Sequence, residues 1–137
     1  PVAQFAYRID PVAFPPSPLN AFKINGVPDI LWLGNNKLLV TERSFSTGIP
    51  GCVIKLYLAD LDGATDISNI NSVKNRPGIV PLSKKLLLNM NSLGIYIDNI
   101  EGATFGPDLD GNRSLIFVAD DNFASDQKTQ FLLFKIK

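Results

Sequence analysis

The segment Leu38-Leu39-Val40-Thr41-Glu42-Arg43-Ser44-Phe45 decides the fold, because its pattern returns later in the chain. The second copy is Leu115-Ile116-Phe117-Val118-Ala119-Asp120-Asp121-Asn122-Phe123, again an apolar run that ends in polar residues and a phenylalanine. In each half, a strand-like run and a turn precede this segment, and another strand-like run follows it. The sequence therefore predicts an antiparallel meander that occurs twice, with a charged tip on its second strand.

Short β-rich runs separated by Gly, Pro, Asn and Asp make up most of the sequence. The expected strands cover residues 3–9, 28–33, 37–43, 52–59, 85–90, 100–105, 114–120 and 129–137. The segments Gly34–Lys37 and Asp110–Asn112 have the composition of tight hairpin turns. Residues 11–20, which include four prolines, and residues 61–81 are expected to form long surface connections. Residues 91–98 are expected to add one helical turn.

Repeated meanders of this kind are typical of β-propeller blades, so we expect an all-β fold of antiparallel four-stranded meanders. A β-sandwich is the alternative. A blade takes about 40 to 50 residues and closure needs at least about four blades, so 137 residues correspond to about two to three blades of an incomplete propeller. Such a piece would expose sheet edges and apolar faces, and we expect it to self-associate or to pair with the missing N-terminal blades.

The composition excludes several classes of function. Thirteen basic side chains balance thirteen acidic ones without a block of like charges, so neither a nucleic acid nor an anionic membrane surface is an expected partner. The longest apolar run, Leu115–Ala119, is far shorter than the roughly twenty residues of a membrane span. The absence of histidine excludes imidazole-based catalysis and His-ligated zinc. Cys52 stands alone, cannot form an internal disulfide, and is expected to be a buried structural thiol.

Two acidic stretches could carry chemistry based on a hard cation. Glu101 starts a strand next to Gly102, where it could bind a divalent cation or act as a general base; the alternative is an ordinary residue at the start of a hairpin. Asp120, Asp121 and Asn122 follow the most apolar strand and could supply oxygen ligands for Ca²⁺. The alternative for these three residues is a solvated turn in which their side chains bind the backbone.

Glu42 and Arg43 lie at the corresponding end of the first copy. Adjacent residues of a strand face opposite sides, so only one of the two can face a central channel without a bulge. The functional interpretation is a channel-facing carboxylate or a phosphate-binding arginine. A structural ion pair is the alternative.

Several motifs stand in an order seen in one known family. They are Gly26–Leu31, Leu38–Phe45, Gly63–Asp66, Asp98–Pro107, Leu115–Phe123 and Gln130–Phe134. With these motifs the chain resembles the phytase-like family, also called the esterase-like activity of phytase family, from Gly26 onward. Members look two to three times as long, so residues 1–137 resemble the C-terminal portion of a phytase-like domain.

The resemblance implies a propeller-like fold in bacterial, often exported proteins, with esterase or phosphomonoesterase activity on a small-molecule ester or phosphoester. It implies a periplasmic or extracellular location, although the sequence opens at Pro1 without a signal peptide. By analogy with metal-dependent propellers, Glu101 would bind a divalent metal, with Ca²⁺ the best fit, near Asp120, Asp121 or Asn122. Arg43 would neutralise a phosphate.

Two functional hypotheses follow. In the first, the protein is a hydrolase in which a metal held by Glu101 and Asp120–Asn122 polarises an ester and a bound water attacks it, with Glu42 and Arg43 as further catalytic residues. In the second, the chain is a non-catalytic propeller segment that binds a partner or orders its own loops. In that case its carboxylates should pair with arginines or backbone amides.

Overall fold

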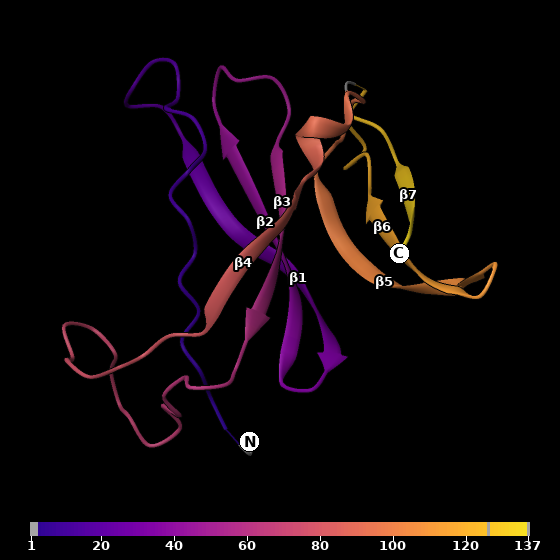
Figure 1. The fold of residues 1–137 in the computed structure, drawn as a ribbon. Helices are drawn as coiled ribbons and strands as arrows, with labels where there is room; N and C mark the ends of the chain where they lie inside the picture. Colours follow the sequence, from indigo (N-terminus) through magenta and orange to yellow (C-terminus); the bar gives the residue numbers. More distant parts are fainter. Residues whose placement is uncertain (1–2, 126, 137) are drawn as a thin grey trace.

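A computed structural model describes residues 3–125 and 127–136, which form two antiparallel β-sheets (Figure 1). The first sheet has the order β1-β2-β3-β4, and its strands are Lys23–Gly34, Lys37–Ser46, Val53–Asp60 and Ser83–Asn89. The second sheet has the order β5-β6-β7, and its strands are Ile100–Leu109, Asn112–Ala119 and Gln130–Lys135. A short 3-10 helix, η1 (Met90–Leu93), connects β4 to the second sheet. It begins one residue before the stretch 91–98, in which one helical turn is expected.

Two tight hairpins begin the two sheets, as the sequence predicts. The β1–β2 hairpin turns at Asn35 and Asn36, with φ of 49° and 57°, and the β5–β6 hairpin turns at Asp110 and Gly111, with φ of 47° and 74°. Positive φ at both central residues matches the right-handed twist of the flanking strands, and Asn, Asp and Gly adopt it most readily. Both meanders are therefore confirmed, the first with four strands and the second with three.

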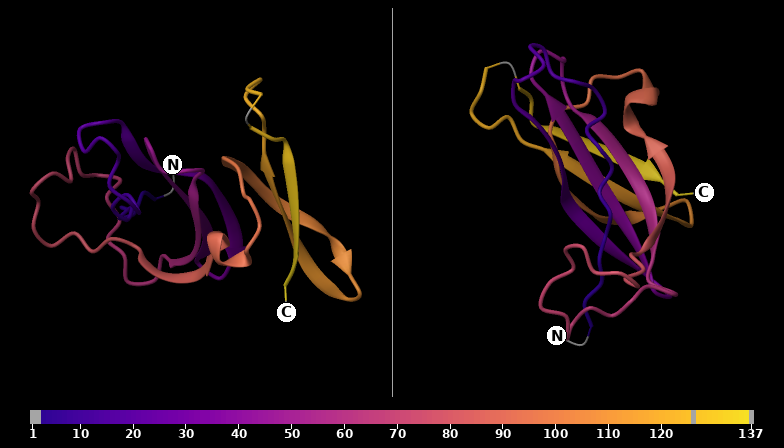
Figure 2. Two further views of the ribbon diagram at one scale, coloured as in Figure 1. Left: turned by 90° about the horizontal axis from the view of Figure 1, so that it is seen from above. Right: turned by 90° about the vertical axis from the view of Figure 1, so that its left-hand side faces the viewer.

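One face of the first sheet packs against one face of the second, and this contact forms the larger core (Figure 2). The packing combines residues of both sheets with Met90 and Ile97 from the connection between them; the sheet residues are Leu39, Ile54, Leu56, Ile100, Leu115, Phe117 and Ala119. Phe117 is fully buried and meets the Phe134 ring edge to face at 5.5 Å between centroids. The apolar run in the second copy of the repeat thus supplies the centre of this core.

The predicted strand at residues 3–9 is wrong. Within this stretch only Phe5 forms a β-bridge, to Asp66, and the segment instead runs over the outer face of the first sheet (Figure 2). Phe5 and Tyr7 there cover a second core cluster built on Val40 and Tyr57. The backbone carbonyls of Gln4 and Ala6 accept hydrogen bonds from Ile67 and Leu82 in the long connection between β3 and β4. The segment therefore pairs with this connection and not with a strand of the first sheet.

Strand β1 begins five residues before the strand expected at residues 28–33. β1 starts at Lys23 and contains an irregular register between Gly26 and Asp29. Pro28 lies inside this irregularity and has no amide hydrogen to donate to a ladder, so the strand continues only because the pairing is interrupted there. Residues 11–20 and the stretch between β3 and β4 form connections without strands, as expected.

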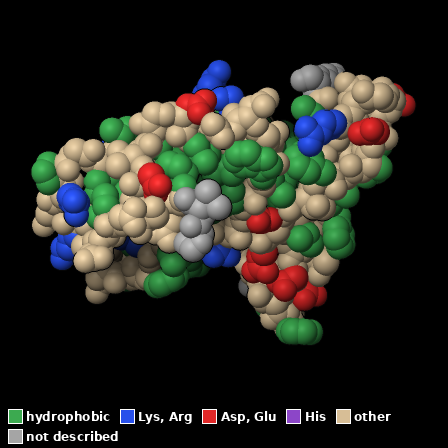
Figure 3. Space-filling model, turned by 90° about the horizontal axis from the view of Figure 1, so that it is seen from below, with side chains coloured by type: hydrophobic (Ala, Val, Ile, Leu, Met, Phe, Trp, Pro, Cys, Tyr) green, Lys and Arg blue, Asp and Glu red, His purple; other side chains and the backbone are tan. Residues whose placement is uncertain are grey.

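Charges and exposed apolar side chains bear on possible partners. On the face shown in Figure 3, Lys and Arg side chains are spread singly, and hydrophobic side chains lie between them. β7 exposes Phe131 and Leu133 on the face of the second sheet that points away from the core. The predicted self-association or pairing with further blades stays a prediction, as does closure into a propeller. Within the described residues, no helix is long and apolar enough to cross a membrane.

Candidate functional site

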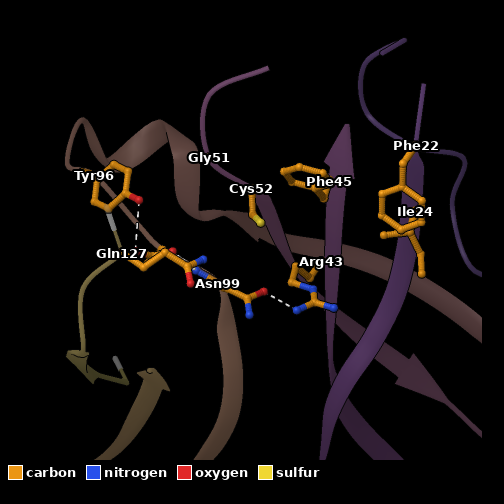
Figure 4. A pocket seen from close by; sticks show the side chains of 10 residues that line it. Phe22, Ile24, Arg43, Phe45, Gly51, Cys52, Tyr96, Asn99 and Gln127 are labelled. Atoms are coloured by element: carbon orange, nitrogen blue, oxygen red, sulfur yellow. Dashed lines mark hydrogen bonds between the residues drawn. The ribbon is translucent and has the colours of Figure 1, made fainter. Parts of the chain in front are cut away.

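A pocket of about 420 Å³ lies where the end of β2 meets the start of β5 (Figure 4). It has an aromatic and aliphatic side and a polar side. Its lining residues are Phe22, Ile24, Arg43, Phe45, Gly51, Cys52, Tyr96, Asp98, Asn99 and Gln127. Both halves of the chain contribute to this wall: Arg43 and Phe45 end the first repeat copy, and Asp98 and Asn99 lie just before β5 of the second sheet.

Arg43 and its neighbour Glu42 face opposite sides of the first sheet, as strand geometry predicts. Arg43 lines the pocket at the junction between the sheets. Glu42 lies on the side covered by the N-terminal segment, where its residue exposure is 1%. The structure therefore places these two candidate catalytic residues in different environments.

Arg43 and Glu101 are connected through Asn99. The Arg43 guanidinium donates from Nη1 to Asn99 Oδ1 (Figure 4), and Asn99 donates from Nδ2 to Glu101 Oε1 at 2.5 Å. Because an amide has one accepting and one donating end, Glu101 fixes the amide orientation that presents oxygen to Arg43. Two predicted catalytic residues from different sheets, Arg43 of β2 and Glu101 of β5, are thus brought into one chain of hydrogen bonds.

The Arg43 guanidinium keeps unused hydrogen-bonding capacity. Its Nε is buried and has no hydrogen-bond partner within the described residues. No ion pair joins Arg43 to a carboxylate in this part of the chain. A guanidinium that is held by a neutral amide and is not neutralised by a carboxylate can attract an anion.

Asp98 is the carboxylate of the pocket, and it holds the rim together. Its exposure is 4%, and it accepts hydrogen bonds from the Asn99 amide at 2.8 Å, the Lys128 amide at 2.8 Å and the Tyr96 hydroxyl at 3.0 Å. Its own amide donates to Gln130 Oε1 at 2.8 Å. These bonds tie the segment before β5 to the segment before β7, so the rim has a defined shape.

Cys52 also lines the pocket, but its side chain is a protonated thiol and not a reactive thiolate. Burial raises the pKa of the Cys52 thiol, and the nearby Arg43 charge offsets only part of this effect. The nucleophilic form is the thiolate. Cys52 is half-buried, in line with a structural role.

Glu101 lies at a bulge in β5. Ile100 pairs with Ala119 and Gly102 pairs with Val118, so Glu101 is the extra residue of its strand. Bulges redirect side chains, and Glu101 is exposed here. A Cβ on Gly102 would lie 3.2 Å from a Val118 methyl group, so Gly102 allows close packing against β6.

The Asp120–Asn122 stretch forms a turn after β6. Asp120 Oδ1 accepts from the Asn122 amide at 3.1 Å, and Asp121 Oδ1 accepts from the Phe123 amide at 3.1 Å. Asn122 Nδ2 donates to Gln127 Oε1 at 3.0 Å, which links this turn to a residue of the pocket wall. Among the described residues, no group of three or more His, Cys, Asp or Glu side chains is close enough to hold a metal ion. The Ca²⁺ site therefore stays a prediction.

Glu42 is the centre of a buried polar network on the opposite face of the first sheet. It accepts hydrogen bonds from Lys84 Nζ at 2.5 Å, Tyr7 Oη at 2.7 Å, Asn25 Nδ2 at 3.0 Å and the Asp10 amide at 3.1 Å. Lys84 also pairs with Asp10 at 2.7 Å. These contacts satisfy both oxygens of a buried carboxylate and attach the N-terminal segment to the sheet.

The same network changes the titration of its members. Hydrogen bonds from Lys84 and Tyr57 to Asp10 hold the pKa of that carboxyl below its usual value. Burial raises the pKa of the Tyr7 and Tyr57 phenols well above their usual range, with further effects from Glu42 and Asp10. At neutral pH the two phenols therefore keep their protons and donate hydrogen bonds to Glu42 and Asp10.

Sequence reasoning missed part of the pocket. Asp98 and Asn99 belong to the same motif as Glu101, so the sequence does carry a signal for them. Phe22 lies in a connection with no repeat pattern, and its place beside Phe45 depends on how residues 11–22 return to the sheet. Tyr96 lies outside the strands and had no signal in the sequence pattern.

The fold and the pocket define a class: an all-β protein of two packed antiparallel meanders, with a partly open pocket that presents an arginine at their junction. The chain belongs to the Phytase-like family, described as "Esterase-like activity of phytase", whose model matches residues 1–123. The match includes the N-terminal segment before Gly26 as well as both repeat copies. No curated protein and no solved structure matches the chain. The family points to a function of the hydrolase type.

Proposed function

We propose that the chain forms part of the site of an ester or phosphoester hydrolase, in which Arg43 binds the anionic group of a small-molecule substrate. The observation that carries this proposal is the Arg43 guanidinium, which lines a pocket, is held by Asn99, and has no carboxylate partner among the described residues. Such a group stabilises negative charge on a substrate or on the transition state of ester cleavage. Family membership supports the same class of reaction.

A divalent cation, with Ca²⁺ the best fit, is a further part of the proposal. The residues that would hold it are Glu101, Asp120, Asp121 and Asn122, because oxygen donors suit a hard cation. The Oδ1 atoms of Asp120 and Asp121 accept backbone amides, and within the described residues their Oδ2 atoms form no hydrogen bond. When bound, the cation would polarise the ester and activate a water molecule. Glu101 would then serve both the cation and the orientation of Asn99.

The test uses the full-length protein and two chromogenic substrates, 4-nitrophenyl acetate and 4-nitrophenyl phosphate. Arg43→Gln is expected to lower kcat/KM by about tenfold or more, and Arg43→Lys by less, because lysine keeps the charge but not the planar fork. Arg113→Gln is the matched control, since Arg113 lies over the Phe105 ring, away from the pocket. Equal rates in Arg43→Gln and Arg113→Gln would overturn the proposal.

A second arm tests the cation. Glu101→Gln and removal of divalent ions with EDTA are each expected to lower the rate by about tenfold, and added Ca²⁺ should restore the EDTA-treated protein but not the variant. A rate that is unchanged in both cases would remove the cation and Glu101 from the proposal and leave Arg43 in it.

A non-catalytic binding or structural module is the second candidate, and the carboxylate contacts favour it. Glu42 is fully engaged with Tyr7, Lys84 and Asn25, and Asp120 and Asp121 accept backbone amides. This candidate predicts no turnover above buffer in the full-length protein. It also predicts that Asp120→Ala and Asp121→Ala lower the thermal midpoint through loss of the turn. Export to the periplasm or the extracellular space is part of either proposal and rests on the family alone.

A further inference from the structure

The pocket has an aromatic side whose exposure requires an explanation. Phe22 is 63% exposed, Ile24 is 43% exposed and Tyr96 is 51% exposed, and all three line the pocket. The Phe22 and Phe45 rings lie 6.2 Å apart between centroids, tilted by 39°. Large apolar side chains gathered around one concavity are typical of a surface that binds an apolar group.

The aromatic side is held in place by backbone contacts. The Phe22 carbonyl accepts hydrogen bonds from the Thr47 amide at 3.0 Å and from the Thr47 hydroxyl at 2.9 Å. Ile24 pairs with Phe45 in the β1–β2 ladder. The apolar side of the pocket is thus formed before any ligand binds, and little conformational entropy is lost on binding.

The charge of the pocket wall limits the charge of its ligand. Arg43 is the cation among the lining residues, and Asp98 is the anion. Asp98 is buried and its oxygens are taken by three donors, so it remains in place when a ligand enters. One guanidinium can pair with one carboxylate or phosphate group, whereas a polyphosphate would bring several further charges next to apolar side chains and Asp98.

We infer that this pocket takes a small amphipathic ester with one anionic group, which pairs with Arg43, and with an aryl or alkyl group, which lies against Phe22, Phe45 and Tyr96. The volume of about 420 Å³ lies within the range of small-molecule sites, roughly 300 to 1,000 Å³. The inference rests on the proposed function for the reaction at this site. It excludes highly phosphorylated substrates, although the family description contains the word phytase.

The experiment measures binding and turnover separately on the full-length protein. Isothermal titration compares 1-naphthyl phosphate, inorganic phosphate and myo-inositol hexakisphosphate. The expected order is tightest binding for 1-naphthyl phosphate. Phe22→Ala should weaken the binding of 1-naphthyl phosphate by about fivefold and leave the binding of inorganic phosphate unchanged, because only the naphthyl ring loses its aromatic contact. Arg43→Gln should weaken both.

Phe123→Ala is the matched control, because Phe123 is fully exposed and does not line the pocket. Ile24→Ser is a second variant for the apolar side, and circular dichroism checks that each variant folds. Tighter binding of the hexakisphosphate, equal effects of Phe22→Ala on both phosphates, or no binding of any probe would overturn the inference. Preferential binding of 1-naphthyl phosphate without hydrolysis would contradict only the hydrolase proposal. Hydrolysis without preferential binding of 1-naphthyl phosphate would contradict only the inference about the ligand.

Discussion

The Asp29 carboxylate on β1 accepts a hydrogen bond from the Ala103 amide on β5, with 2.5 Å between Oδ2 and N. Its other oxygen accepts from the Ile30 amide at 2.7 Å. Asp29 follows the irregularity around Pro28, so the interruption that the proline imposes on β1 lies beside the point where the two sheets are joined. This connection lies near the pocket, because Ile24 of β1 belongs to the apolar side of the pocket and Asn99 on its polar side directly precedes β5.

Asp29→Ala should destabilise the protein. The substitution leaves the partly buried Ala103 amide without its acceptor, which costs about 1–3 kcal/mol. Urea unfolding followed by circular dichroism measures the change. The control is Asp108→Ala, at an exposed residue of β5 whose side chain forms no hydrogen bond to any part of the chain that the structure describes; it should stay within about 0.5 kcal/mol of wild type. Equal effects at the two positions would contradict the role of Asp29.

Glu42→Ala should be among the most damaging single substitutions. It removes the acceptor of four donors and one of the two carboxylate partners that Lys84 has among the described residues, at an expected cost of about 3–5 kcal/mol. The double variant Glu42→Ala/Lys84→Ala should lose less than the sum of the single variants, since the two groups interact directly. Asp108→Ala, at an exposed carboxylate of β5, provides the control. Strict additivity would argue against a coupled network.

Acid should loosen the N-terminal segment through Asp10. The folded-state pKa of Asp10 lies below its usual 3.8, so its stabilising effect is fully present above that pH and is lost as the pH falls below it. Unfolding midpoints measured from pH 7 to pH 2 should fall less steeply below pH 4 in Asp10→Asn than in wild type. Identical slopes would show that Asp10 has the same pKa in both states.

Alkaline titration should show two resistant phenols. The pKa values of Tyr7 and Tyr57 are raised in the folded state, so their stabilising effect is complete below pH 10 and is lost as the pH rises above it. Absorbance at the tyrosinate band should show the Tyr7 and Tyr57 phenols ionising together with unfolding. Tyr7→Phe and Tyr57→Phe identify the two transitions. Ionisation of either phenol while the protein stays folded would refute the burial of the network.

Gly106→Ala tests the close packing of β5 on β6. A Cβ at Gly106 would lie 2.4 Å from Ser114 Oγ and 3.1 Å from the Ile116 side chain, and Ser114 is fully buried. The expected cost is about 1–3 kcal/mol by thermal or urea unfolding. Gly26→Ala is the matched control on β1, where nothing lies within 4 Å of the added carbon. A loss at Gly26 that equals the loss at Gly106 would contradict the packing.

The sequence by itself determined the two meanders. The apolar runs of 38–45 and 115–123 and the turns at Asn35–Asn36 and Asp110–Gly111 act locally, through side-chain alternation and positive φ, so the hairpins follow from neighbouring residues. Alternation also predicts that Glu42 and Arg43 separate to opposite faces. The family could likewise be identified from its motifs.

Only the tertiary structure decided which polar groups meet. The side-chain partners of Glu42 lie 17 to 42 positions away along the chain, and Arg43 bonds to Asn99, 56 positions away. Phe22 lies before β1 and packs its ring beside that of Phe45 on β2. Residues 3–9 have the composition of a strand, yet they lie over the outer face of the first sheet. Phe5 and Tyr7 pack there against the core cluster of Val40 and Tyr57. Such contacts depend on how the two sheets and the N-terminal connection pack together. A local sequence pattern does not show which residues far apart in the chain become neighbours.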